Sequence, residues 1–142
     1  MVQIGLVAED DLSMAALDRV CADAGRDFVV ARRLVERGVG NIKRSLDKYR
    51  QASHVIPHVV LADLDRNPCP PALLAEWRAD RLPANMMLRL AVRATESWLL
   101  GDREAFSDFV GVPNHRVPMR PEEEPDPKAS LIQAFGAAKT RE

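Results

Sequence analysis

The chain has 142 residues, a length that suits one compact domain with a substantial core, and it predicts a single domain over 1–142. Its composition is 46% hydrophobic and 29% charged with a formal net charge of -1, so no overall charge draws it to nucleic acid or to a membrane surface. No apolar stretch reaches the roughly eighteen residues that a membrane-spanning helix needs, and the first residues lack the pattern of a signal peptide. We therefore expect a cytoplasmic protein without a membrane partner.

The cysteines and histidines give no sign of a disulfide framework or a zinc site. Cys21 and Cys69 are only two and do not form a CxxC motif, so we expect reduced thiols. His54, His58 and His115 are scattered along the chain, which argues against zinc.

Strand-like apolar runs and helix-like apolar spacings alternate along the chain. In chain order they predict a strand at 2–8, a helix at 12–25, a strand at 27–34, a helix at 41–52, a strand at 59–62, a helix at 70–80, a strand at 85–94, helical structure at 95–111 and a closing helix at 126–140. The helix at 41–52 carries the strongest basic patch. The proline-rich segment 112–125 is predicted to be an irregular loop.

Chemical signals mark two of the helix boundaries. Gly101 and Asp102 offer a stop followed by a new N-cap, so 95–111 is predicted to be one bent helix or two short ones. Asp126 and Pro127 suit the N-cap and the first residue of the closing helix.

Strands that alternate with helices imply βαβ units, which build a mostly parallel sheet with helices on both faces. The predicted fold class is therefore α/β, a Rossmann-like domain with about four strands. In such sheets, ligands bind beyond the carboxyl ends of the strands.

Acidic side chains follow three of the predicted strands at those carboxyl ends. They are Glu9, Asp10 and Asp11 after the first strand, Asp63 and Asp65 after the third, and Glu96 after the fourth. Asp63 and Asp65 are expected to point the same way, because side chains on a strand alternate with period two. Carboxylates this close repel one another unless a cation or a shared proton lies between them. Oxygen ligands suit Mg²⁺ or Mn²⁺, so the pattern predicts a metal site.

Four segments carry a resemblance to a known family, in the same order along the chain: "GLVAEDD", "VVLADLDR", "VRATESWLLGDREAF" and "DPKASL". A glutamate that ends a first strand and an Asp-x-Asp pair that ends a later one resemble the TOPRIM domain of topoisomerases, primases and OLD-family nucleases. The sequence is most similar to small bacterial TOPRIM-like proteins with a domain of unknown function, which show a "WLLaD" segment and a later "DPK". One departure is Asp10, because TOPRIM proteins usually have glycine after the glutamate.

The resemblance implies a Mg²⁺-dependent (or Mn²⁺-dependent) nuclease or another phosphoryl-transfer domain that acts on DNA or RNA. It also implies a possible partner ATPase and a role in bacterial defence. The residues implied are Glu9 as general base or metal ligand, Asp63 and Asp65 as the principal metal ligands, Glu96 as an additional ligand, and Arg66 and Lys128 as phosphate contacts.

Each of these residues also has a purely structural interpretation. Asp63 and Asp65 could cap a turn, Glu96 could favour the dipole of its helix, and Lys128 could be an ordinary solvated residue. Trp98 and the two leucines after it are expected to pack in the core.

Two other functions remain open at this point. An inactive TOPRIM-like module would bind a partner ATPase or nucleic acid without cutting it, an alternative that Asp10 supports. A receiver-like signalling domain would be phosphorylated on Asp63, with its remaining residues at Asp10, Asp11, Thr95 and Lys128.

Overall fold

The computed structural model describes residues 1–138. The contacts of the chain gather into two compact units, within what the sequence predicts as one domain. The first unit contains residues 1–63 and 67–90. The second contains residues 64–66 and continues from residue 91.

The first unit is built on a parallel sheet of four strands. They are β1 (Val2–Ala8), β2 (Phe28–Val35), β3 (His58–Asp63) and β4 (Met86–Ala91), in the spatial order β2-β1-β3-β4. The α/β class and the mostly parallel sheet are confirmed. β4 ends at Ala91 rather than at residue 94, because the chain then turns into a helix.

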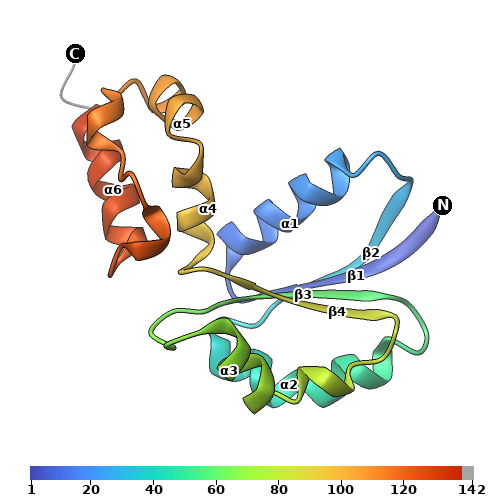
Figure 1. The fold of residues 1–142 in the computed structure, drawn as a ribbon. Helices are drawn as coiled ribbons and strands as arrows, with labels where there is room; N and C mark the ends of the chain where they lie inside the picture. Colours follow the sequence, from blue (N-terminus) through green and yellow to red (C-terminus); the bar gives the residue numbers. More distant parts are fainter. Residues whose placement is uncertain (139–142) are drawn as a thin grey trace. The chain divides into compact units, whose positions relative to one another are not determined.

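Three helices cover the two faces of this sheet. α1 (Asp11–Asp23) lies on one face, and α2 (Val39–Ala52) and α3 (Pro70–Glu76) lie on the other, followed by a short 3-10 helix at Ala79–Arg81 (Figure 1). α1 buries Met14 and Leu17 against the sheet, and Ala24, which follows its last residue, is exposed. The buried residues of α2 are Ile42, Leu46 and Tyr49, the apolar face that the sequence predicts.

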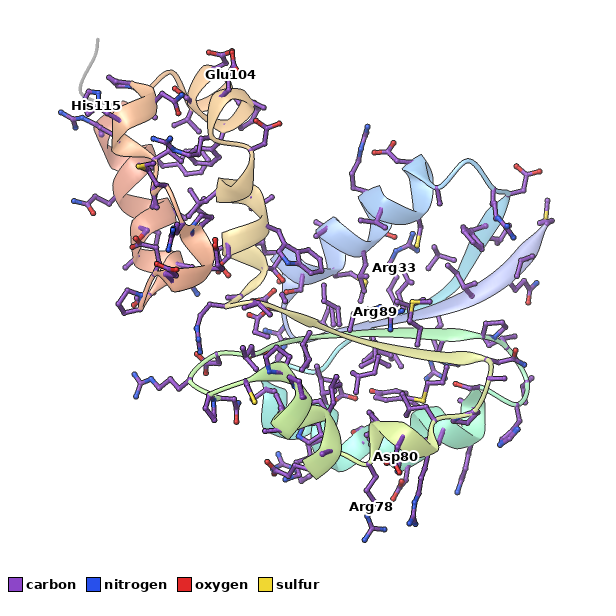
Figure 2. The ribbon with its side chains drawn as sticks, viewed as in Figure 1. Arg33, Arg78, Asp80, Arg89, Glu104 and His115 are labelled. Carbon is purple, nitrogen blue, oxygen red and sulfur yellow. The ribbon has the colours of Figure 1, made fainter. Side chains whose placement is uncertain are left out.

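β1 and β2 pair in parallel, with one irregularity in their register. Ile4 pairs with Val30, whereas Gly5 pairs with Arg32, so β2 carries an extra residue at this point. Further along β2, Arg33, labelled in Figure 2, forms a 2.8 Å ion pair with Asp18 of α1. This ion pair joins the outer strand to the helix that covers it.

The second unit has a separate helical core. It contains α4 (Thr95–Gly101), α5 (Arg103–Val110) and α6 (Pro127–Ala138). The buried residues that form this core are Leu100, Phe106, Val112, Val117 and Ala134. Asp102 accepts a 3.0 Å hydrogen bond from the Ala105 N–H, so the segment 95–111 forms two helices, one of the two predicted alternatives.

The segment 112–125 is tied to the helices of the second unit. It forms short 3-10 helices at Asn114–Arg116 and Pro121–Glu123. Arg103 donates hydrogen bonds to the carbonyls of Val117 (3.1 Å) and Asn114 (2.8 Å). The Arg103 side chain thus provides hydrogen-bond donors to two backbone carbonyls of this segment.

The start of α6 confirms its predicted signals. Asp126 accepts a 2.9 Å hydrogen bond from the Ala129 N–H, and Pro127 is the first helical residue. The predicted end of this helix at residue 140 lies outside the described residues. Among helices of the described part of the chain, none combines the length and the apolar character needed to cross a bilayer.

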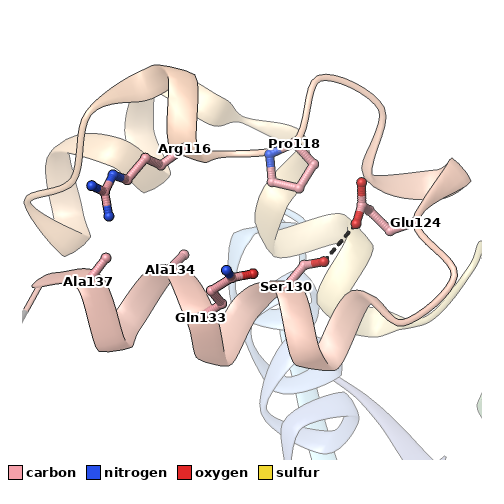
Figure 3. A pocket seen from close by; sticks show the side chains of 7 residues that line it. All are labelled: Arg116, Pro118, Glu124, Ser130, Gln133, Ala134 and Ala137. Carbon is pink, nitrogen blue, oxygen red and sulfur yellow. Dashed lines mark hydrogen bonds between the residues drawn. The ribbon is translucent and has the colours of Figure 1, made fainter.

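A cavity of about 350 Å³ lies between α6 and the preceding loop (Figure 3). The polar residues that line it include Arg116 and Gln133, and Glu124 accepts a 2.7 Å hydrogen bond from the Ser130 hydroxyl. The cavity contains none of the site residues that the sequence predicts.

Candidate active site at the carboxyl edge of the sheet

Glu9 and Asp63 meet at the carboxyl ends of neighbouring strands. The parallel register pairs Ala8, the last residue of β1, with Leu61 of β3, so Glu9 lies beside the last two residues of β3, Ala62 and Asp63. The backbone N–H of Asp63 lies 3.4 Å from Glu9 Oε2, to which it donates a long hydrogen bond. Asp63 is only 9% exposed and Glu9 is partly buried. The structure thus brings together two of the predicted site residues.

The strand order explains why these two ends can form a binding site. The chain leaves β1 through α1 to reach β2 on one side, and it leaves β2 through α2 to reach β3 on the other side of β1. The connecting helices lie on opposite faces of the sheet (Figure 1). This reversal between β1 and β3 is the topological switch point, where open parallel sheets bind their ligands.

A cavity of about 330 Å³ lies next to Glu9. The residues that line it come from the ends of β1 and β2 and the start of α1: Glu9, Asp10, Asp11, Val35, Arg37 and Gly38. It therefore combines carboxylates with one guanidinium at the carboxyl edge of the sheet.

Asp10 has a structural role in this cavity wall. Its Oδ1 accepts a 2.8 Å hydrogen bond from the Ser13 N–H, which makes Asp10 the N-cap of α1. An N-cap satisfies an N–H group that has no partner within its helix. This capping role accounts for an aspartate at the position where the TOPRIM pattern has glycine.

Arg37 is a candidate site residue that the sequence patterns do not predict. It follows β2 directly after Glu36, at the same edge of the sheet as Glu9, and it lines the cavity next to Glu9. The signal for it was the turn "ERGVG", which places a basic residue beyond the carboxyl end of a predicted strand.

Asp65 does not lie on a strand. The alternation of strand side chains, from which we expected Asp65 to point the same way as Asp63, therefore does not apply to it. β3 ends at Asp63, and Asp65 is an exposed residue with φ of 54° in the second unit. Its N–H donates to the Arg93 carbonyl at 2.8 Å, and its carbonyl accepts from Arg93 Nη1 at 2.6 Å. The alternation of a strand cannot extend through a residue in the left-handed region.

Glu96 belongs to the first turn of α4 in the second unit and is 6% exposed. The start of that helix is fixed by Ser97, whose Oγ accepts from the Arg93 N–H (3.1 Å) and donates to the Pro121 carbonyl (3.1 Å). Trp98 and Leu99 are 44% and 40% exposed, so the prediction that they pack in the core is wrong. The same prediction is confirmed for Leu100, which belongs to the core of the second unit.

The two predicted phosphate contacts also lie in the second unit. Arg66 and Lys128 are both exposed, and Lys128 is the second residue of α6.

Glu9 and Asp63 supply two carboxylates to the carboxyl edge of the sheet, fewer ligands than a metal cage made only of protein needs. Within residues 1–138, no group of three or more His, Cys, Asp or Glu side chains is placed to hold a metal ion. Mg²⁺ keeps several water ligands and commonly binds through one or two carboxylates together with substrate phosphates. Glu9 and Asp63 are the carboxylates that adjacent strand ends supply here, and the contact between them joins the Glu9 carboxylate to the Asp63 backbone.

Two pKa shifts occur on the α1 side of the first unit. Burial raises the pKa of the Cys21 thiol, and the nearby Asp18 carboxylate raises it further, against an opposing effect of Arg33. The hydrogen bond to Asp18 raises the pKa of Arg33. A thiol with a raised pKa is mostly protonated at neutral pH, so Cys21 is a poor nucleophile.

No family model, curated protein or solved structure matches this chain. The TOPRIM-like resemblance therefore stays a prediction from the sequence motifs.

Proposed function

We propose that the protein is a TOPRIM-like, Mg²⁺-dependent nuclease or related phosphoryl-transfer domain. The observation that carries this proposal is the contact between the Glu9 carboxylate and the backbone of Asp63 at the switch point between β1 and β3. Two carboxylates at a ligand-binding edge, next to a cavity with a guanidinium, suit the hydrolysis of a phosphodiester better than a neutral substrate.

Glu9 acts as the general base in this proposal. Glu9 lines a cavity and is partly exposed, a position in which a carboxylate can take a proton from an attacking water. Asp63 is more deeply buried and is the last residue of β3, which suits a fixed metal ligand. A bound Mg²⁺ would activate water and neutralise the charge that develops on the phosphoryl oxygens.

The wider proposal follows the resemblance. We propose a nucleic-acid substrate in the cytoplasm, a possible partner ATPase, and a role in bacterial defence.

A second candidate function is an inactive TOPRIM-like module that binds a partner without cutting nucleic acid. The observation that favours it is the capping role of Asp10, which places a carboxylate where a glycine would let the backbone approach a phosphate. Both functions use the same edge of the sheet, and a cleavage assay separates them.

The test is cleavage of labelled single-stranded and double-stranded DNA and RNA with Mg²⁺ or Mn²⁺, and with EDTA as the metal-free reference. We expect cleavage by the wild type, and a loss of about 100-fold or more in Asp63→Asn and Glu9→Gln. The matched control is Asp27→Asn, which removes an exposed carboxylate just before β2, at the opposite edge of the sheet. Cleavage that survives Asp63→Asn would reject the site, and no cleavage of any substrate would favour the inactive module.

A further inference from the structure

We infer that Arg37 holds a phosphate group of the substrate in the cavity that it lines together with Glu9. This inference rests on the proposed function and adds a binding residue to it. Arg37 and Glu9 line the same cavity of about 330 Å³, although they lie far apart in the sequence.

The backbone holds Arg37 next to Glu9. The Glu36 N–H donates to the Ala8 carbonyl at 2.9 Å, and the Gly38 N–H donates to the Glu9 carbonyl at 3.3 Å. These two bonds join the residues on both sides of Arg37 to the end of β1. The position of Arg37 at the site is therefore fixed by the backbone of the sheet and not by the freedom of a long loop.

A side-chain brace fixes the conformation of the same turn. The amide of Asn41 donates to the carbonyls of Glu36 (2.7 Å) and Arg37 (3.3 Å). Arg37 has φ of 54° and Gly38 has φ of 131°. A non-glycine residue in the left-handed region is uncommon and costs conformational energy, which the surrounding contacts must offset, and such residues cluster at functional sites.

The charges of the cavity give Arg37 its role. The carboxylates of Glu9, Asp10 and Asp11 line the cavity and would repel an anionic phosphate. Arg37 forms no ion pair with any residue of the described part of the chain, so its guanidinium is available to a ligand. A guanidinium offers two parallel N–H donors to a phosphate, a geometry that a lysine cannot provide.

Binding of a fluorescein-labelled 20-nucleotide DNA or RNA strand, measured by anisotropy with and without Mg²⁺, tests the inference. Arg37→Ala should raise Kd about tenfold. It should also reduce the slope of the logarithm of the binding constant against the logarithm of the salt concentration by about one, because one phosphate contact is lost. The matched control is Arg26→Ala, because Arg26 is an exposed arginine just before β2, whereas Arg37 lies just after it. This control should change Kd by less than about twofold, and Arg37→Lys should restore only part of the affinity.

Folding and metal binding are measured in parallel on the same variants. Arg37→Gly should unfold at or above the wild-type temperature, because glycine adopts a positive φ without strain, and yet it should bind nucleic acid as weakly as Arg37→Ala. The rise in melting temperature with Mn²⁺ should persist in both variants.

Each outcome separates this inference from the proposed function. Equal weakening in Arg37→Ala and Arg26→Ala would mean diffuse charge attraction and would overturn the role of Arg37. So would wild-type affinity in Arg37→Ala, whereas no binding of either strand by the wild type would overturn the nucleic-acid substrate of the proposed function. A wild type without any response to Mn²⁺ would instead overturn the metal site of the proposed function.

Discussion

The two compact units place their polar residues by different means. In the first unit, the register of parallel strands decides which residues meet, so Glu9 and Asp63 come together although 54 positions separate them. In the second unit, the predicted site residues lie on a turn or in the first turns of helices, and Asp65 and Lys128 are exposed. A ladder of backbone hydrogen bonds fixes a side chain more firmly than a turn at the surface does, so the sheet unit is the better basis for a catalytic proposal.

The largest effect that can test this comparison comes from the two cores. Leu61 in β3 and Leu100 in α4 are both 0% exposed. Each leucine-to-alanine change should lower the free energy of unfolding by about 2–5 kcal/mol, because it leaves a cavity in a packed core. Hydrogen exchange read by mass spectrometry should show faster exchange mainly within 1–90 for Leu61→Ala, and mainly within 91–138 for Leu100→Ala. Equal acceleration over both ranges would show that the units unfold as one.

Metal binding should produce the next largest effect. A divalent ion at hundredfold excess over Kd stabilises a folded site by about 2.7 kcal/mol, which for a chain of this length corresponds to a rise in melting temperature of roughly 5–10 °C. Asp63→Asn should erase the response to Mg²⁺ and Mn²⁺, because it removes one of the two proposed carboxylate ligands.

Asp65→Asn is the paired variant for the metal experiment. Because Asp65 lies in an exposed turn, we expect it to reduce the response less than Asp63→Asn does. If both variants lower stability and the wild type ignores both metals, the carboxylates are structural caps.

Two glycines sharpen the comparison with the smallest effects. A Cβ at Gly5 would lie 2.6 Å from Cδ2 and Nε2 of the buried His58 ring, whereas a Cβ at Gly136 in α6 would meet nothing within 4 Å. Gly5→Ala should therefore lower the free energy of unfolding by about 1–3 kcal/mol, because the core is overpacked. Gly136→Ala should raise the free energy of unfolding by roughly 0.5–1 kcal/mol, because alanine is the better helix former. Chemical denaturation measures both changes.

A double variant identifies the cause of the Gly5 effect. Gly5→Ala should cost less in a His58→Ala background, because the clash is then removed. An equal cost in both backgrounds would mean that the ring is not the cause.

The fold could be predicted well from local patterns. The apolar run before Asp63 is a strand because four successive apolar residues suit a position covered on both faces, and Asp102 and Asp126 cap helices as their positions suggest. These features depend on a few neighbouring residues, which the sequence shows directly.

The candidate site could be predicted only in part. Glu9 and Asp63 follow from the rule that parallel strands end at one edge, but the rule fails for Asp65 because the chain adopts a positive φ beyond the strand. Arg37 looked like an ordinary surface arginine, since its position depends on hydrogen bonds to the end of β1 that no local pattern reveals. The exposure of Trp98 depends on tertiary packing in the same way.

The extra residue in β2 affects how the molecule behaves among its own copies. β2 and β4 are the outer strands of the sheet, and an outer strand offers unpaired backbone groups to which a strand of another molecule can bind. β2 is irregular at the step between Val30 and Arg32, and it carries two adjacent arginines there, Arg32 and Arg33. A bulge twists β2, so a straight strand of another molecule cannot stay in register with it. Such pairing would also bury the charges of the two arginines. This edge is therefore protected against the strand-by-strand growth that leads to fibrils.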